Sequence, residues 1–412
     1  MIKIDDRIIQ AEVELTKDFK KAEEIALQNQ NKVLQAFINN KISSTHFAGT
    51  TGYGYDDIGR EKLCAVFANY FGAEDAIVSQ ALLCGSHAIT TVLYGLLRPN
   101  DLMLSITGKP YDTLDETIFG LNNGEDNGSL KDFGVKYKGI DLVDNTDFNT
   151  EEIIKELKTS KPKITYIQRS CGYLYRTALE ISKIKEIVKI IREIDKQTII
   201  VVDNCYCECV EMEEPTEVGA DIAVGSLIKN PGGGLISNGG YIVGKRKYID
   251  WIAGRFTSPA IKTEVGSFEQ GYRLAFQGFF MAPHTVLQAK KGSMLIAKVM
   301  QNLGYKTIDN TNNLADIVRS IVFEDKEDLC NFCTSIQKMS PVDSFVTPVA
   351  SEMAGYDCEV IMSAGCFVQG STMELSCDSP LRKPYVLYLQ GGLTYEYGKL
   401  GIMLAIENMI NL

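Results

Sequence analysis

The sequence predicts an α/β protein with a large, doubly wound domain on a mostly parallel sheet and a smaller α+β domain at the C-terminus. Short apolar runs alternate with helical patterns from about residue 76 to residue 229, as in successive βαβ units. One such run, Ile199 to Val202, is unbroken, which is typical of a parallel strand buried on both faces. The chain of 412 residues is also longer than one ordinary domain.

Composition and charge favour a soluble globular protein. Hydrophobic residues make up 45% of the chain and charged residues 23%, which allows a sizeable core. The net charge of -11 argues against nucleic acid as the main partner, because phosphate binding needs a basic surface. The N-terminus shows no apolar signal segment, and no run approaches the ~20 apolar residues of a membrane-spanning helix. We therefore expect a cytoplasmic protein with no membrane partner and with reduced cysteines.

The first part of the chain predicts a helical arm and a glycine-rich loop. Apolar residues recur at helical spacing between residues 4 and 38. Residues 45–60 form a loop with many glycines and aromatics, and Asp56 or Asp57 is expected to cap a helix that runs to Phe71. The expected divisions are an N-terminal arm at 1–45, a large domain at 46–302 and a small domain at 303–412.

Apolar and helical patterns assign the remaining elements in order. In the large domain the expected strands are 76–79, 102–106, 135–138, 164–168, 199–202, 222–224 and 237–244. The expected helices there are 85–97, 150–158, 181–194 and 267–303, the last broken at Pro283, where a new helix is expected to begin. The small domain is expected to hold strands 320–323, 359–362 and 385–389 and helices at 326–339 and from 395 onward.

An acid and an amine follow two of these strands. Asp203 ends the unbroken run, and Lys229 comes shortly after the strand at 222–224. Ligands of open α/β sheets bind outside the carboxyl ends of the strands, so both side chains are expected to face one site. Pyridoxal phosphate (PLP) uses such a pair, a lysine for the Schiff base and an aspartate that keeps the pyridine nitrogen protonated.

The residues around this pair resemble a known family. Asp203, the Ser226-x-x-Lys229 tetrad and the glycine-rich run from Asn230 to Gly234 resemble the fold-type-I PLP-dependent enzymes. The sequence is more closely similar to the methionine γ-lyase-like family, whose members are often labelled aluminium resistance proteins. Two cysteines depart from the family pattern, Cys171 where arginine is expected and Cys207 where glycine is expected. These departures bear on substrate choice more than on cofactor binding.

Several residues are candidates for holding the cofactor. Gly85 and Ser86 open a helix whose N-terminal N–H groups can bind the phosphate, together with Ser226. His87 could contact the ring or phosphate, or could be an ordinary helix histidine. The resemblance implies that Tyr111 stacks on the pyridine ring, and its hydroxyl could protonate a leaving thiolate.

Other candidates concern the substrate and the ring oxygen. Gln168 or Ser170 could bond the phenolic oxygen of the cofactor, and Arg169 could position a substrate anion. By resemblance, Arg382 is expected to bind the substrate α-carboxylate, because a guanidinium makes two parallel hydrogen bonds to that group.

The resemblance also implies an oligomer. In relatives, a tyrosine and an arginine from a comparable loop reach the phosphate site of the neighbouring subunit, which makes Tyr55 and Arg60 candidates here. Arg60 paired with a nearby acid of its own loop is the alternative. We expect a homo-oligomer, a dimer at least, with a tetramer favoured.

The expected function is that of a PLP-dependent carbon–sulfur lyase. It would act on a small sulfur amino acid by α,β- or α,γ-elimination through a Lys229 internal aldimine, with no resident metal. A PLP-dependent aldolase or aminotransferase is the alternative within the enzymes. A non-enzymatic stress or metal-tolerance protein is the alternative outside them, but its possible oxygen ligands look like a solvated face: Glu208, Glu211, Glu213 and Glu214.

Overall fold

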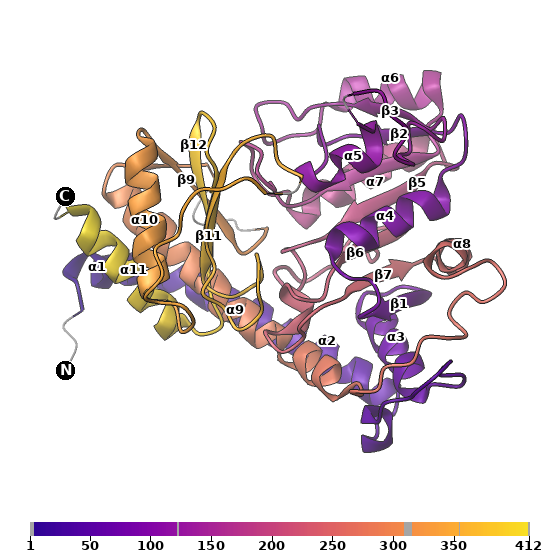
Figure 1. Cartoon of the computed structure of the whole chain (residues 1–412), viewed down its shortest axis with the longest axis horizontal. Coiled ribbons are helices and arrows are strands. Elements are labelled where there is room, and N and C mark those ends of the chain that lie inside the picture. The colour runs from indigo at the N-terminus through magenta and orange to yellow at the C-terminus, as the bar shows by residue number, and fades with distance from the viewer. Residues whose placement is uncertain (1–3, 122, 309–314, 354, 411–412) are drawn as a thin grey trace.

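Two sheets organise the chain, which the computed structural model describes at residues 4–121, 123–308, 315–353 and 355–410. The large sheet has seven strands in the order β1-β7-β6-β5-β4-β2-β3, and the smaller sheet has five in the order β10-β11-β12-β9-β8 (Figure 1). The large-sheet strands are β1 Asp75–Ser79, β2 Leu102–Ser105, β3 Lys136–Gly139, β4 Ile164–Gln168, β5 Ile199–Asp203, β6 Ile222–Ser226 and β7 Gly240–Gly244. The small-sheet strands are β8 Lys306–Thr307, β9 Val318–Phe323, β10 Val360–Ser363, β11 Ser376–Pro380 and β12 Tyr385–Gln390.

The large sheet is mostly parallel, which confirms the expected fold class. Strands β3, β2, β4, β5 and β6 are parallel neighbours, whereas β7 runs antiparallel to both β6 and β1. Helices cover the sheet on both sides and bury its apolar residues. The helices of this part are α3 Ile58–Tyr70, α4 Gly85–Leu96, α5 Asp115–Phe119, α6 Thr150–Ser160, α7 Ile181–Ile194 and α8 Arg246–Phe256.

Long helices connect the two sheet regions. The arm forms α1 (Asp6–Glu14) and α2 (Thr16–Asn39), and α2 packs along α9 (Arg273–Asn302) across the join between the sheets (Figure 1). Pro283 lies inside α9, so the expected break there is wrong. Pro283 and its neighbours are buried against α2 and α3, and this packing holds the helix continuous despite the missing N–H.

The small sheet turns its two faces to different surroundings. Helices α10 (Lys326–Lys338) and α11 (Tyr395–Ile410) lie on its outer side, away from the large sheet (Figure 1). Leu387 and Leu389 of β12 pack in the core under these helices, whereas Tyr388 between them packs with Cys171 of the large-sheet region. Alternate side chains of this strand therefore face the large sheet.

Most expected elements are present. Strands β8 and β11 of the small-sheet region and helix α8 of the large-sheet region were not expected from the sequence. The domain boundaries at 45/46 and 302/303 stay predictions, and residues 309–314 of the connection lie outside the described part of the chain. None of the helices in that part is long and apolar enough to span a bilayer.

Candidate active site

The predicted acid and amine lie at the carboxyl ends of neighbouring strands. Strands β5 and β6 pair in parallel with Asp203 opposite Val224, and Lys229 follows β6 directly. Both side chains line one cavity of about 790 Å³, whose walls come from the large sheet and from residues 318–390 of the small-sheet region. The sequence argument that these two groups face a common site agrees with this placement.

Asp203 is buried and Lys229 is half-buried, and the charge of each acts on the other. Burial alone lowers the pKa of Lys229, but neighbouring Cys205, Tyr206 and Asp203 outweigh it and raise the pKa above its usual value. The Lys229 Nζ lies 4.0 Å from the centroid of the Tyr206 ring, a cation–π position. Burial raises the pKa of Asp203, against the opposing charge of Lys229. The cavity floor thus holds a protonated amine and a carboxyl group in a water-poor setting.

The start of α4 forms a cradle beside Ser226. A Cβ added to Gly85 would lie 3.2 Å from the Ser226 Cβ and 3.4 Å from the Cys205 Sγ, so glycine permits this close approach. The Ser86 Oγ hydrogen-bonds the Thr113 Oγ1 at 2.6 Å. Among the described residues no side chain caps this helix end, and its first residues, Gly85 and Ser86, line the cavity. Such an N-terminus suits a phosphate, and the residues present fit the cofactor.

Tyr111 lines the same cavity within a larger group of tyrosines. Its hydroxyl hydrogen-bonds that of Tyr356, and its ring centroid lies 5.7 Å from that of Tyr173. Burial raises the pKa of Tyr111 well above its usual value, so the hydroxyl keeps its proton at neutral pH. Sequence reasoning missed the other four tyrosines of this wall, which come from four separate segments: Tyr173, Tyr206, Tyr356 and Tyr388.

Gln168 presents a buried amide to the cavity. Its Nε2 donates to the Ser170 carbonyl at 3.2 Å, while its buried Oε1 accepts no hydrogen bond from any described residue. A buried polar atom without a partner is costly, and a ligand with a donor group would relieve that cost. Ser170 and Cys171 line the cavity beside it.

Arg169 does not reach the cavity, which corrects the prediction of a substrate contact. Its guanidinium lies on the other side of the sheet, where it pairs with Glu211 at 2.5 Å and donates to the Asn204 Oδ1 at 2.7 Å. Successive residues of a strand point to opposite faces, so Gln168 and Arg169 cannot both face one site.

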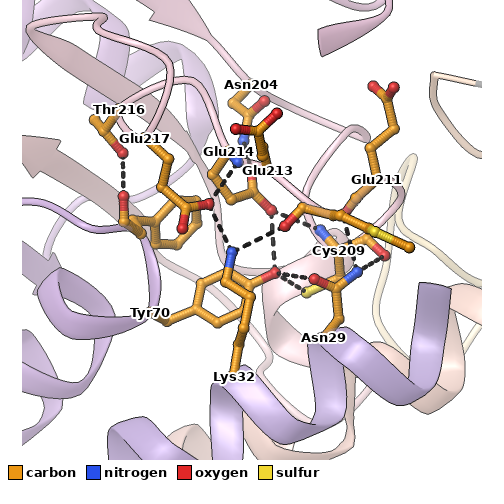
Figure 2. A network of polar contacts seen from close by, with 12 residues as sticks. Asn29, Lys32, Tyr70, Asn204, Cys209, Glu211, Glu213, Glu214, Thr216 and Glu217 are labelled. Carbon is orange, nitrogen blue, oxygen red and sulfur yellow. Dashed lines mark hydrogen bonds and ion pairs between the residues drawn. The ribbon is translucent and has the colours of Figure 1, made fainter. Parts of the chain in front are cut away.

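The predicted solvated face of glutamates is instead partly a buried network (Figure 2). Glu214 is 1% exposed and accepts hydrogen bonds from the Tyr70 hydroxyl, the Cys209 N–H and the Asn204 amide at 2.9–3.1 Å. Asn29 of α2 donates to the carbonyls of Cys209 and Glu211, both at 2.9 Å. This network fixes the loop that follows Asp203 to the arm and α3.

Arg382 also lies away from the cavity. It occupies the turn between β11 and β12, where it pairs with Asp112 at 3.2 Å and Asp357 at 2.9 Å, and it is not among the residues that line the cavity. The sequence could not show that two acids flank this guanidinium. The prediction that Arg382 binds the substrate carboxylate has no support in this arrangement.

The remaining candidates lie at a second cavity of about 670 Å³ or on the surface. His87 and Arg60 line that cavity, and the His87 Nδ1 accepts a hydrogen bond from the Leu83 N–H at 3.1 Å, as in an ordinary helix histidine. Arg60 donates to the backbone carbonyls of Gly54 at 3.0 Å and Gly266 at 2.9 Å. Tyr55 is 63% exposed and is not among the residues that line either cavity.

Sequence reasoning missed two polar residues of the small sheet that line the first cavity, Asp378 and Gln390. Both are 2% exposed, and each has a side-chain oxygen that accepts no hydrogen bond from the described residues. Asp378 belongs to β11, whose sequence Ser-Cys-Asp-Ser-Pro is typical of a turn and gave no strand signal. Period-2 alternation in β12 is the one signal that could have placed Gln390 on the same face as Tyr388.

The fold defines a class of proteins. A large, mostly parallel sheet with a second, smaller sheet is the fold of the fold-type-I PLP-dependent enzymes. A cystathionine gamma synthase structure from Xanthomonas oryzae pv. oryzae shares the fold, with a TM-score of 0.63 at 13% identity over 93% of this chain and 98% of that one.

Comparison with known proteins defines the family. The model of the methionine gamma-lyase family matches residues 4–410, and the chain belongs to that family. The Bacillus subtilis protein YnbB is 44% identical over 403 residues, which cover 98% of this chain and 95% of YnbB. A structure from Clostridium novyi NT described as a carbon-sulfur lyase involved in aluminum resistance is 44% identical, with a TM-score of 0.92 over 98% of this chain and 96% of its own.

These findings confirm the recognised family and the expectation of a PLP-dependent lyase. L-methionine gamma-lyase of Pseudomonas putida matches more distantly, at 28% identity over 207 residues, 50% of this chain and 46% of that enzyme. The chain is therefore an enzyme of the carbon–sulfur lyase type.

Proposed function

We propose that this enzyme binds PLP on Lys229 and cleaves the carbon–sulfur bond of a small sulfur amino acid by elimination at the β or γ carbon. The observation that carries the proposal is that Lys229 and Asp203 line one cavity, next to Gly85 and Ser226. When bound, the cofactor supplies an electron sink for negative charge at the substrate α-carbon.

Each residue of the floor has a role in holding the cofactor. The Asp203 carboxylate would face the ring nitrogen, where its negative charge favours the protonated form. The first turn of α4, with Ser86 and Ser226, would bind the phosphate. Tyr111 would flank the ring, and Gln168 would bring its buried amide to the ring oxygen.

Lys229 and Tyr111 would move the protons. The Lys229 amine, once released by the substrate and deprotonated, takes the α-proton. The Tyr111 hydroxyl, which its raised pKa keeps protonated, is placed to donate a hydrogen bond and then a proton to the departing sulfur. Tyr356, bonded to Tyr111, can orient that hydroxyl.

A neighbouring subunit would complete the charge balance. Among the described residues that line the cavity, Lys229 is the one that carries a positive charge. A phosphate and a substrate carboxylate together need more positive charge than one lysine provides. We therefore propose a homo-oligomer, a dimer at least, in which Tyr55 and Arg60 of one subunit reach the site of the next.

Trapping the cofactor tests the proposal. The protein with added PLP should absorb near about 420 nm, and borohydride reduction with peptide mapping should place the label on Lys229. Lys229→Ala should lose the label, while Lys158→Ala, a change on the exposed side of α6, should keep it. A label on another lysine, or none, would refute the assignment.

A panel of amino acids then separates the reaction types. Elimination should release thiol, ammonia and a 2-oxo acid in equal amounts. Glycine with an aldehyde would indicate the aldolase, and an oxo acid without ammonia would indicate transamination.

A further inference from the structure

Tyr206 holds the face of its ring against the amine of Lys229. The residue lies in the turn that follows β5, shortly after Asp203, and both Tyr206 and Lys229 line the first cavity. The Lys229 Nζ lies over the ring, 4.0 Å from its centroid. An aromatic face attracts an ammonium group, and the attraction is larger where water is excluded. The roles proposed for Lys229, Asp203 and Tyr111 leave this ring unused.

The backbone of Tyr206 adopts a strained conformation. Its φ angle is 69°, in the left-handed region that residues with a Cβ rarely adopt. Glycine occupies this region freely and asparagine does so occasionally, but a bulky side chain there costs free energy. Strain of this kind persists only where the surrounding contacts outweigh it, and it gathers at functional sites. The contacts of the Tyr206 side chain must therefore hold the residue in this conformation.

Contacts with both sheet regions hold the side chain. The Tyr206 hydroxyl donates to the Ser371 carbonyl of the small-sheet region at 3.1 Å. The ring packs against a cluster that includes Cys171 of the large-sheet region, Val318 of β9 and Tyr388 of β12. The hydroxyl end of Tyr206 is thus fixed to the small-sheet region, while the face of the ring is turned to Lys229.

Charged and titratable groups from both sheet regions also act on the Lys229 amine: Asp203, Cys205 and Glu208 on the segment that starts with β5, and Asp378 and Tyr356 in the small-sheet region. The attraction between charges falls slowly with distance, so it leaves a flexible lysine several positions. A ring face attracts only a cation that lies over it. Tyr206 therefore selects one position for the amine.

We propose that Tyr206 is a positioning residue that holds the Lys229 amine over its ring and stabilises the positive charge that the amine gains when it takes the α-proton. This inference rests on the proposed function, in which Lys229 is the base. In that step the electron pair of the Nζ forms the new N–H bond, and the pair of the broken C–H bond stays on the substrate. The charge on the Nζ appears directly over the ring face, where it is favoured.

Removing the ring should change two rates in opposite directions. Attachment of PLP to Lys229 requires the neutral amine, because only that form can attack the aldehyde. Without the ring the ammonium form is less favoured, so Tyr206→Leu should attach PLP about 3- to 10-fold faster at pH 7.5. The same variant should lower kcat by about 5- to 30-fold, because the charge created on the Nζ has lost its partner.

Two assays measure these rates. Absorbance near about 420 nm after mixing PLP-free protein with PLP gives the attachment rate. Release of methanethiol from S-methyl-L-cysteine gives kcat, and the α-deuterated compound should show a larger isotope effect in Tyr206→Leu because the proton transfer has become slower.

Two variants are controls in both assays. Tyr206→Phe keeps the ring and loses only the bond to the Ser371 carbonyl, so both rates should stay within about 3-fold of those of the unchanged enzyme. Tyr248→Leu removes a ring whose centroid lies 5.8 Å from the Nζ of Lys247 on α8, and it should change neither rate.

A second ringless variant covers a failure of Tyr206→Leu to fold. Tyr206→Asn suits the left-handed backbone and should give the same two opposite changes. Slower attachment together with slower turnover in the ringless variants would show that Tyr206 only supports the fold, and would overturn the proposal. An equal loss in Tyr206→Phe would assign the effect to the hydroxyl and would overturn it as well.

The two assays separate this inference from the proposed function. A label on Lys229 with unchanged attachment rates in the ringless variants would keep the PLP site and refute the role of Tyr206. Faster attachment in the ringless variants, with no methanethiol from the unchanged enzyme, would support the contact between ring and amine and refute elimination from S-methyl-L-cysteine.

Discussion

Glu214 and Asp378 are both buried carboxylates, but they belong to regions with opposite hydrogen bonding. Glu214 accepts three hydrogen bonds within the network of Figure 2, and both of its oxygens are used. Asp378 has one oxygen bonded to Ser371, and its other oxygen accepts no hydrogen bond from the residues that the structure describes. The satisfied group stabilises the position of the Asp203 loop, whereas the unsatisfied group is available to a ligand. Burial alone therefore does not distinguish a structural acid from a binding acid. The number of hydrogen bonds that the carboxylate accepts does distinguish them.

Glu214→Ala should have the largest effect of these substitutions, a loss of folding stability. It leaves the Tyr70 hydroxyl, the Cys209 N–H and the Asn204 amide without an acceptor, so the free energy of unfolding should fall by about 3 kcal/mol. Urea unfolding measures this. Glu213→Ala, which removes only an exposed pair with Lys185, should cost less than about 0.5 kcal/mol. Equal losses in the two variants would show that the network is not structural.

Asp203→Asn should have the second-largest effect, and that effect should be on kcat. An amide cannot favour the protonated ring nitrogen, so kcat should fall about 100-fold, while the cofactor still attaches to Lys229. Steady-state kinetics and the absorbance band measure the two effects separately. A variant that keeps full kcat would remove Asp203 from the mechanism.

Asp378→Asn should have the opposite effect on stability from Glu214→Ala. Burial raises the pKa of Asp378 to about 6, against lowering contributions from Ser371, Tyr173 and Lys229. The folded state then holds this proton more tightly than the unfolded state, so the unfolding free energy falls as pH rises from about 4 through 6. An asparagine carries no such cost.

Thermal unfolding at two pH values checks this sign. At pH 7.5 Asp378→Asn should be more stable than the unchanged protein by about 1–2 kcal/mol, and near pH 4.5 the difference should shrink. A variant that is less stable at pH 7.5 would place Asp378 with the satisfied acids such as Glu214.

Tyr356→Phe should give the smallest change. It removes the hydrogen bond to the Tyr111 hydroxyl but keeps the ring, so kcat should fall about 3- to 5-fold with KM nearly constant. Tyr53→Phe, an exposed position, serves as the control in the same assay. A loss of about 100-fold would instead make Tyr356 the proton donor.

The large sheet and the cavity floor could be predicted because their signals are local. The strand at 199–203 begins with a continuous apolar run, the strand at 164–168 is mostly apolar, and each ends at the polar side chain that lines the cavity. The positions of Asp203 and Lys229 follow from the rule that parallel strands present their carboxyl ends at one edge. No comparable rule placed Tyr356 or Tyr388.

The far wall of the cavity could not be predicted for physical reasons. Strand β11 has a turn-like composition and is held by its neighbours β10 and β12, so tertiary pairing overrides local preference. Arg169 and Arg382 were assigned from chain position, but strand alternation and flanking acids decide where a guanidinium points. A glutamate that the fold buries cannot be distinguished from an exposed one by its residue type alone.

The order in which the chain supplies the two walls has a consequence for synthesis. The residues of the floor are all present once Lys229 has been made, but Asp378 and Gln390 come from the last strands of the chain. A protein cut short before β11 would keep the lysine and the aspartate of the floor in its sequence but would lack the opposite wall of the cavity. One side of the cavity is thus encoded early in this polypeptide, and the other is encoded late.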